Sequence, residues 1–345
     1  MRISSSLVIP EPPISIYGNF TDWTQVSAGT AHSLGLRANG TAWAWGYNSL
    51  GRLGDGTTVS KTSPVSVSGG FTDWIQLSAG DAHSSGIRAN GTAWGWGNNG
   101  SGRLGDGTAT SKSVPVSVVG GFVDWTQISA GGTHTLGVRA NGTAWAWGIN
   151  TNGRLGDNTI VAKSSPVSVV GGFTDWTQVS AGATHSLGLR ANGTAWAWGV
   201  NTYGRLGDNS TTSRSSPVSV VGGFTDWIQL SAGYTHSFGL RANGTAWSWG
   251  PNLSGRLGND SGLGGGRSSP GSILGGFTDW VQLAATRSGG LGIRANGTAW
   301  AWGGNSYGQL GDGTIVDKSS PISVIGGLAD WVQLSGANHS LGVVR

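Results

Sequence analysis

The chain has 345 residues, of which 37% are apolar and 10% are charged, and its formal net charge is +4. This apolar content is ample for at least one sizeable core, which excludes a disordered chain. An excess of four positive charges is too small to indicate a nucleic-acid-binding protein, and the absence of cysteine excludes disulfides, thiolate catalysis and cysteine-based metal sites.

The glycine and tryptophan contents predict an all-β protein. The sequence holds 64 glycines and 19 tryptophans but only one methionine. Glycine weakens the interior of helices, whereas tryptophan favours the half-buried surface of a sheet. We therefore expect strands and turns along the whole chain.

The first 18 residues lack the features of a targeting segment. They contain no charged stretch followed by a long apolar one, and no run of about 18 apolar residues occurs anywhere in the chain. We therefore expect no signal peptide and no membrane insertion, and a location in the cytoplasm of the producing cell or in association with a virion.

A unit of about 51 residues then repeats seven times. Each copy contains an Asp-Trp pair, and the tryptophans of these pairs are Trp23, Trp74, Trp125, Trp176, Trp227, Trp280 and Trp331. In the second copy, runs typical of strands occupy residues 75–79, 83–88, 92–96 and 114–119, and Asn-Gly between the second and third runs indicates a hairpin. This pattern predicts one domain over residues 1–345, a seven-bladed β-propeller of four-stranded antiparallel blades.

The last copy ends after its second strand, and its missing part is expected at the N-terminus. Residues 12–18 align with the fourth strand of the other copies, and residues 4–9 are expected to replace the third strand. An open solenoid would need polar caps at both ends, whereas a ring needs ends that complement each other. We therefore expect residues 1–18 to complete the last blade and close the ring.

The repeated unit resembles the regulator of chromosome condensation repeat. The segments that carry the resemblance are Gln-Val-Ser-Ala-Gly, His-Ser, Trp-Ala-Trp-Gly and Gly-Arg-Leu-Gly-Asp-Gly, and the similarity extends over residues 12–345. The resemblance implies a seven-bladed propeller and a bacterial or phage type of copy. It implies much less about activity, because that family includes a nucleotide exchange factor, a secreted β-lactamase inhibitor and a UV-B photoreceptor.

The repeated polar residues favour structural roles over catalysis. Histidine recurs at one position of the unit in His32, His83, His134, His185, His236 and His339. A catalytic histidine would be unique, so we expect imidazoles that bond to the backbone between strands or blades, and a ring of blades is too wide for them to bind one metal ion. The repeated aspartates offer no pair in differing environments for acid–base chemistry. We therefore predict no enzymatic activity, no cofactor and no metal site.

Two sets of arginines also repeat, one before the hairpin turn, as in Arg37, and one in the Gly-Arg-Leu-Gly segment, as in Arg52. Their regular placement beside repeated aspartates favours ion pairs that connect blades. A ring that binds anions is the alternative.

The copies differ from one another mainly on one face of the predicted ring. We call it the variable face, and it carries the turns between the first and second strands, such as 29–31, and the loops between the third and fourth strands, such as 47–60. The residues predicted to bind a partner there are Tyr47, Asp81, Asn98, Tyr203, Tyr234, Arg287 and Tyr307. Four of the five tyrosines lie on this face, and tyrosine is enriched in binding surfaces, although neutral drift in loops explains the divergence equally well.

The expected function is that of a non-catalytic binding or structural propeller that presents the variable face to a macromolecule, a protein more than a glycan and not a nucleic acid. Two alternatives stay open. The low charge and the abundance of Gly, Ser, Thr and Asn favour a structural or attachment component of a virion or cell surface. The family resemblance allows a regulator that acts as a guanine nucleotide exchange factor, although units of nearly constant length leave no room for an inserted hairpin.

Overall fold

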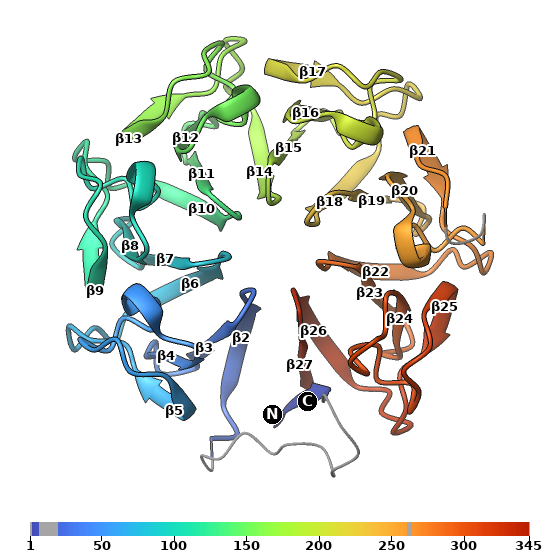
Figure 1. The fold of residues 1–345 in the computed structure, drawn as a ribbon, viewed down its shortest axis with the longest axis horizontal. Coiled ribbons are helices and arrows are strands. Elements are labelled where there is room, and N and C mark those ends of the chain that lie inside the picture. The colour runs from blue at the N-terminus through green and yellow to red at the C-terminus, as the bar shows by residue number, and fades with distance from the viewer. Residues whose placement is uncertain (1, 7–19, 261–263, 345) are drawn as a thin grey trace.

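The computed structural model describes residues 2–6, 20–260 and 264–344, which form seven antiparallel sheets around a central axis (Figure 1). Six sheets have four strands each, and the seventh sheet, built from both ends of the chain, has three. The prediction of an all-β propeller with four-stranded antiparallel blades is confirmed. The prediction of seven such blades is wrong, because only six blades are four-stranded within the described ranges.

The six complete blades follow the order of the chain. Blade one contains β2 (Trp23–Ala28), β3 (His32–Arg37), β4 (Ala42–Gly46) and β5 (Lys61–Ser66), and blade two contains β6 (Trp74–Ala79), β7 (His83–Arg88), β8 (Ala93–Gly97) and β9 (Lys112–Ser117). Blade three contains β10 (Trp125–Ala130), β11 (His134–Arg139), β12 (Ala144–Gly148) and β13 (Lys163–Ser168), and blade four contains β14 (Trp176–Ala181), β15 (His185–Arg190), β16 (Ala195–Gly199) and β17 (Arg214–Ser219). Blade five contains β18 (Trp227–Ala232), β19 (Ser237–Arg241), β20 (Ala246–Gly250) and β21 (Arg267–Ser272), and blade six contains β22 (Trp280–Ala285), β23 (Gly289–Arg294), β24 (Ala299–Gly303) and β25 (Lys318–Ser323).

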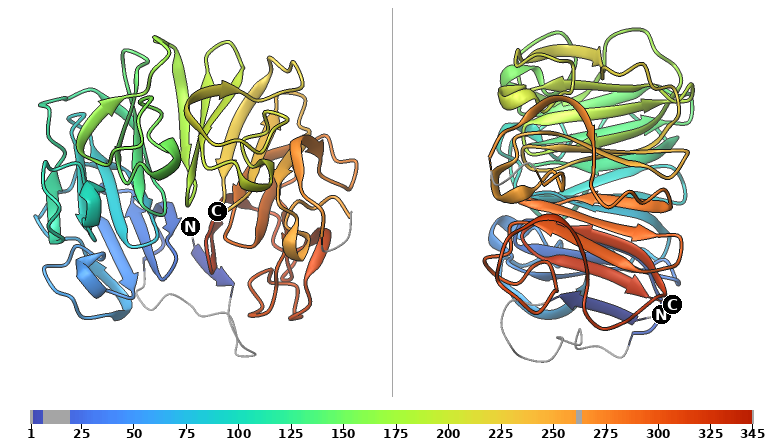
Figure 2. Two further views of the ribbon diagram at one scale, coloured as in Figure 1. Left: turned by 45° about the horizontal axis from the view of Figure 1, so that its top comes forward. Right: turned by 90° about the vertical axis from the view of Figure 1, so that its right-hand side faces the viewer.

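In the first five blades, the loop between the third and fourth strands begins with a short 3₁₀ turn. These turns are η1 (Ser49–Gly51), η2 (Gly100–Gly102), η3 (Thr151–Gly153), η4 (Thr202–Gly204) and η5 (Leu253–Gly255). All five lie on the side of the ring that faces the viewer in Figure 1, and the edge-on view of Figure 2 shows them along one side of the molecule. This side is the variable face.

The predicted strands and hairpins agree closely with the structure. In blade two, the second strand has the expected bounds, and the other three begin or end within about two residues of them. The hairpin turn between β7 and β8 places Gly91 at a φ of 75°, in the left-handed region that favours glycine. The carbonyl oxygen of Val123 approaches within 2.0 Å of the place where a Cβ of residue 91 would lie, so only glycine fits there.

The apolar core lies between adjacent blades. In the cluster between blades one and two, Leu34 and Leu53 pack against Trp74, Leu77 and Trp96 of the next blade. An equivalent cluster fills each of the seven interfaces around the ring, including the one between the three-stranded sheet and blade one. A tryptophan from the third strand fills the space between twisted sheets, and removing such a buried side chain costs about 3–5 kcal/mol.

The seventh sheet closes the ring with strands from both termini. β1 (Arg2–Ser6) pairs with β27 (Ser340–Val344), which pairs with β26 (Trp331–Gly336). β1 thus takes the position of the third strand, which confirms closure by the N-terminal segment, although the strand covers residues 2–6 and had been expected over 4–9. The fourth strand expected at residues 12–18 lies outside the described residues.

Side chains on the innermost strands connect each blade to the next. The amide of Gln25 accepts a hydrogen bond from the backbone N–H of Leu77 at 2.8 Å and donates one to its carbonyl oxygen at 3.1 Å. The hydroxyl of Ser27 accepts a hydrogen bond from the N–H of Ala79 at 2.9 Å. Equivalent glutamines and serines repeat this pattern and line a central channel of about 240 Å³. Because their polar atoms already bond to neighbouring backbone, the channel wall is a structural part of the ring.

Candidate protein-binding face

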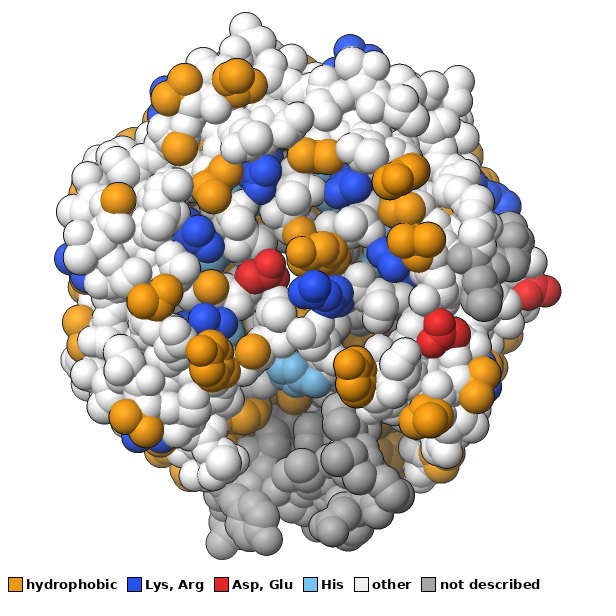
Figure 3. All heavy atoms as spheres, viewed as in Figure 1, with side chains coloured by type: hydrophobic (Ala, Val, Ile, Leu, Met, Phe, Trp, Pro, Cys, Tyr) orange, Lys and Arg blue, Asp and Glu red, His pale blue; other side chains and the backbone are white. Residues whose placement is uncertain are grey.

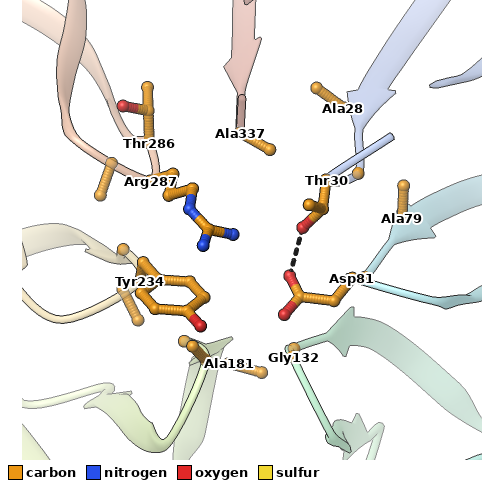
Figure 4. A pocket seen from close by; sticks show the side chains of 18 of the residues that line it. Ala28, Thr30, Ala79, Asp81, Gly132, Ala181, Tyr234, Thr286, Arg287 and Ala337 are labelled. Atoms are coloured by element: carbon orange, nitrogen blue, oxygen red, sulfur yellow. Dashed lines mark hydrogen bonds between the residues drawn. The ribbon is translucent and has the colours of Figure 1, made fainter. Parts of the chain in front are cut away.

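The turns between the first and second strands of all seven sheets surround the mouth of the central channel. They leave a pocket of about 110 Å³ on the variable face (Figure 4). Thr30 donates a hydrogen bond to the Asp81 carboxylate at 2.5 Å, and Arg287 lies on the opposite side of the mouth with its guanidinium 4.3 Å from the ring centre of Tyr234. Gly132 and Ala183 occupy the corresponding turns of other blades and add little side chain. The mouth is therefore polar on two sides, and elsewhere residues with small side chains line it.

A groove of about 910 Å³ opens beside this mouth and crosses blades four, five and six and the three-stranded sheet. The residues that line it include Tyr203, Arg205, Tyr234, Pro251, Leu253, Arg256, Arg287, Tyr307 and His339. In the space-filling view of the variable face, apolar side chains and arginines gather around the centre (Figure 3). Grooves that combine aromatic surface with a few polar groups are typical of binding sites.

The structure brings four of the seven predicted partner-binding residues into the groove. They are Tyr203, Tyr234, Arg287 and Tyr307. Asp81 lies at the channel mouth, in the pocket that it shares with Tyr234 and Arg287.

The two remaining predicted residues lie apart from both cavities. Tyr47 is exposed over blade one, where its ring centre is 4.9 Å from the Arg52 guanidinium carbon. Asn98 is half-buried and accepts a hydrogen bond from the N–H of Gly100 at 2.8 Å, which shapes its own loop. We therefore keep Tyr47 as a candidate contact at the rim, and assign Asn98 a local structural role.

Tyr203 has a backbone conformation that disfavours its side chain. Its φ is 64°, in the left-handed region, where bulky residues are rare. The equivalent residue of the preceding blade is Asn152, a residue type that adopts this region more readily, with the same φ. The ring of Tyr203 is 66% exposed, so burial does not compensate for the strain. The same position has a φ of 58° to 65° in the first five blades, with Leu50, Ser101 and Ser254 among them, so the conformation belongs to the repeated turn and is not specific to Tyr203.

The arginines of the Gly-Arg-Leu-Gly segments, for which ion pairs between blades were the expectation, form a ring on the variable face. Arg52, Arg103, Arg154, Arg205 and Arg256 each extend toward the turn between the first and second strands of a blade. Arg52 donates to the carbonyl oxygen of Asp81 at 2.9 Å, and Arg205 donates to the hydroxyl of Thr184 at 2.8 Å. In the part of the chain that the structure describes, these arginines donate to neutral oxygens. The expectation that this set forms ion pairs is wrong, because the nearby aspartates bond elsewhere.

Those aspartates stabilise their own loops. Asp55 accepts hydrogen bonds from the N–H and hydroxyl of Thr57 and from the Asn48 amide, and it pairs with Lys61 at 3.7 Å. Burial by itself would raise the pKa of Asp55, but these hydrogen bonds outweigh it and lower the pKa. The other arginine set does form ion pairs, as in Arg37 with Asp22 at 2.8 Å, but within one blade rather than between blades.

The repeated histidines connect neighbouring blades, as expected of a structural role. Nε2 of His32 lies 2.8 Å from the hydroxyl of Ser84 in the next blade, and that hydroxyl donates to the carbonyl oxygen of Arg52 at 2.8 Å. The hydroxyl therefore accepts a hydrogen bond from a neutral imidazole. Only His236 bonds to a backbone oxygen, that of Gly289, at 2.9 Å, so the expected backbone partner is the exception. Burial first, and then the charge of Arg52, lowers the pKa of His32 to about 3.

Among the described residues, no group of three or more His, Asp or Glu side chains is placed to hold a metal ion. No helix within the same ranges is long and apolar enough to cross a membrane.

Comparison with known proteins defines the family of the chain. The regulator of chromosome condensation (RCC1) repeat matches residues 39–87, 90–138, 141–189, 192–240 and 296–343, which is more than half of the sequence. The chain belongs to the RCC1 repeat family. A second description of the RCC1 repeat matches six segments between residues 23 and 309, which overlap those of the first.

Several members of the RCC1 repeat family are similar to this chain over most of its length. The ultraviolet-B receptor UVR8 of Arabidopsis thaliana is 28% identical over 331 residues, which are 92% of this chain and 74% of the receptor. The human regulator of chromosome condensation is 26% identical over 94% of this chain and 83% of its own. The crystal structure of Prp20p from Saccharomyces cerevisiae, described with its binding to Gsp1p and histones, superposes with a TM-score of 0.83 at 20% identity, covering 94% of this chain and 83% of Prp20p.

These plant, human and yeast relatives support the RCC1-repeat fold. They give no support to the expectation of a bacterial or phage type of copy, nor to that of a virion component.

Proposed function

We propose that this chain is a non-catalytic binding propeller whose variable face holds a protein partner. The observation that carries the proposal is the convergence of Tyr203, Tyr234, Tyr307 and Arg287, which differ from the residues at the same positions of most other blades, in one groove. A scaffold needs no such divergence, since the interfaces between its blades repeat one pattern. Aromatic side chains and arginine carry most of the binding energy at protein interfaces.

Protein binding also agrees with the description of a structural relative. Prp20p is described as binding Gsp1p and histones. At 20% identity that likeness shows the fold alone. The partner of this chain is therefore inferred from the residues of its own groove.

The test is partner capture from the native source with matched variants. Replacing Tyr47, Tyr203, Tyr234 and Tyr307 by Ala removes exposed rings from the variable face. We expect this variant to keep its thermal midpoint, because exposed residues change stability by about 0.5 kcal/mol or less, and to lose the partner.

The matched control replaces four exposed apolar residues outside the variable face, at the start of first strands and in the loops before them. They are Ile75, Val123, Ile228 and Leu328. This control is expected to capture the partner as the parent does. Equal capture by the tyrosine variant would exclude the variable face as the binding surface.

A guanine nucleotide exchange activity is the alternative in the enzyme class. It is favoured by the similarity to the regulator of chromosome condensation. Acceleration of guanine nucleotide release from a panel of nucleotide-binding proteins, at catalytic concentrations of the purified chain, would replace the non-catalytic proposal. We expect no acceleration.

A further inference from the structure

We propose that the groove of the variable face receives an acidic segment of the partner protein. The carboxylates of that segment pair with the groove arginines, and its apolar side chains cover the groove tyrosines. The residues that would make these contacts are Arg205, Arg256, Arg287, Tyr203, Tyr234 and Tyr307. This inference rests on the proposed function and specifies the chemistry of the partner.

The groove carries positive charge that its own lining does not neutralise. Among the residues that the structure describes, three arginines line it, and no aspartate or glutamate belongs to its lining. The one histidine of the lining, His339, is neutral at pH 7 because burial lowers its pKa. Complementary charge is what selects a partner and guides its approach to such a surface.

Arg205 is the clearest case of a cation without a counter-charge. Its residue is 6% exposed, and arginine at such burial is normally paired with an anion. Nε donates to the carbonyl oxygen of Thr202 at 3.2 Å and Nη1 to the hydroxyl of Thr184 at 2.8 Å. Both acceptors are neutral, and in the part of the chain that the structure describes Nη2 has no hydrogen-bond partner. A carboxylate entering the groove would supply a charge-assisted bond there.

Arg256 adds a second cation beside the first. It donates to the carbonyl oxygen of Leu253 at 2.8 Å and to the hydroxyl of Thr235 at 2.6 Å, which are again neutral acceptors. Burial, followed by the positive charge of Arg256, lowers the pKa of Arg205 to about 10. The fold thus holds two guanidinium groups where they repel each other, and a bound anion would remove that repulsion.

The apolar part of the groove favours a protein segment over a small anion. The rings of Tyr203 and Tyr307 are 66% and 67% exposed, and Leu253, which also lines the groove, is exposed. A free phosphate or carboxylate would leave these surfaces in water and would fill little of about 910 Å³. A nucleic acid would need a longer track of positive charge than three arginines. An acidic peptide with apolar side chains would pair with the arginines of the groove and also cover its exposed apolar surface.

Binding of a designed probe tests the inference directly. The probe is a fluorescently labelled peptide of four Asp-Phe-Glu repeats, and its neutral counterpart has four Asn-Phe-Gln repeats. We expect the full chain to bind the acidic peptide at least about tenfold more tightly than the neutral one, with an affinity that falls between about 50 mM and about 500 mM NaCl. Fluorescence anisotropy measures both.

The repeat supplies matched variants. Gln309 occupies the arginine position in blade six, so the double variant Arg205→Gln, Arg256→Gln introduces a side chain that the fold already accepts there. We expect it to bind the acidic peptide at least about tenfold more weakly. The control Arg52→Gln, Arg103→Gln makes the same change in blades one and two, away from the groove, and is expected to bind within about twofold of the parent.

Three results would overturn the inference. They are equal affinity for the acidic and neutral peptides, equal loss in the two double variants, and tighter binding of a single-stranded oligothymidylate of matched charge than of the acidic peptide. Capture of the native partner by Arg205→Gln, Arg256→Gln, together with its loss in the tyrosine variant, would also reject the acidic segment while the proposed function stands.

Discussion

At the scale of single residues, equivalent positions of the blades serve as internal references. Tyr203 and Asn152 share one place in the repeat and the same φ of 64°, so their difference in side chain is separated from any difference in backbone. The repeated turn imposes this left-handed φ on Leu50, Ser101 and Ser254 as well, and asparagine adopts it at lower cost than tyrosine. A bulky residue in the left-handed region is a cost to folding that a binding role would justify.

We expect Tyr203→Asn to raise the free energy of unfolding by up to about 1 kcal/mol, because asparagine adopts the left-handed region at lower cost than tyrosine. Urea denaturation followed by tryptophan fluorescence measures the change. The reverse variant, Asn152→Tyr, is the control and is expected to lose a similar amount. A less stable Tyr203→Asn would show that the tyrosine ring packs favourably in the free protein.

At the scale of elements, the contacts between blades use one bonding pattern around most of the ring. A histidine on the second strand of one blade reaches a hydroxyl on the second strand of the next, as His83 reaches Thr135 at 2.9 Å. Blade six lacks both groups, because Gly289 and Gly290 replace them. The Trp302 indole then donates to the Arg256 carbonyl at 3.1 Å, the type of acceptor that a hydroxyl uses elsewhere. The scaffold preserves hydrogen bonding even where the repeat diverges.

The buried histidines predict a loss of stability in mild acid. Burial lowers the pKa of His32 and His236 to about 3 and that of His83, His134 and His185 well below its usual value. The folded chain therefore stays unprotonated at these sites as the pH falls below about 6.5, whereas the unfolded chain takes up protons. Each such histidine lowers the free energy of unfolding by about 1.4 kcal/mol for each pH unit below about 6.5.

We expect the thermal midpoint to fall steeply between about pH 6.5 and pH 4.5, above the range in which unfolded aspartates are protonated. Calorimetry at a series of pH values measures it. The variant His32→Gln should show a weaker dependence of stability on pH, because it lacks one of the histidines that take up a proton on unfolding. A midpoint that stays constant across this interval would contradict the burial of neutral imidazoles.

Part of this architecture could be predicted from the sequence, and part could not. The strands and the ring could be predicted from the regular spacing of tryptophans such as Trp74 and Trp125, because all copies of the unit share one sequence pattern. The convergence of Tyr203, Tyr234 and Arg287 did not follow, because it depends on how three blades tilt around the axis. Arg52 was misassigned for a related reason: Asp55 lies nearby in sequence, but the guanidinium reaches the next blade.

At the scale of the whole molecule, closure of the ring depends on the sheet shared by the two ends of the chain. Five residue pairs join β1 to β27, with Ser4 opposite Gly342. β27 in turn contributes Leu341 and Val343 to the apolar cluster shared with blade one. The backbone N–H of Val26 in blade one also donates a hydrogen bond to the side-chain oxygen of Gln333 at 2.8 Å.

Removal of residues 1–6 should therefore weaken the whole ring. The deletion leaves β27 with an unpaired edge, which promotes pairing with other chains. We expect a clearly lower thermal midpoint and larger species in size-exclusion chromatography. A truncated chain that stays monomeric and melts within a degree or two of the parent would mean that β1 adds nothing to closure.

The pairing of Arg2 with Val344 sets the two termini side by side on adjacent strands (Figure 1). In blade two, the three residues Ala89, Asn90 and Gly91 lie between Arg88 and Thr92, whose backbones are hydrogen-bonded across the hairpin. A linker of that length between residues 344 and 2 would turn the chain into a covalent circle without moving a blade. The circle could then be cut at any of the equivalent Asn-Gly turns, which gives a family of circular permutants with new ends far from the groove.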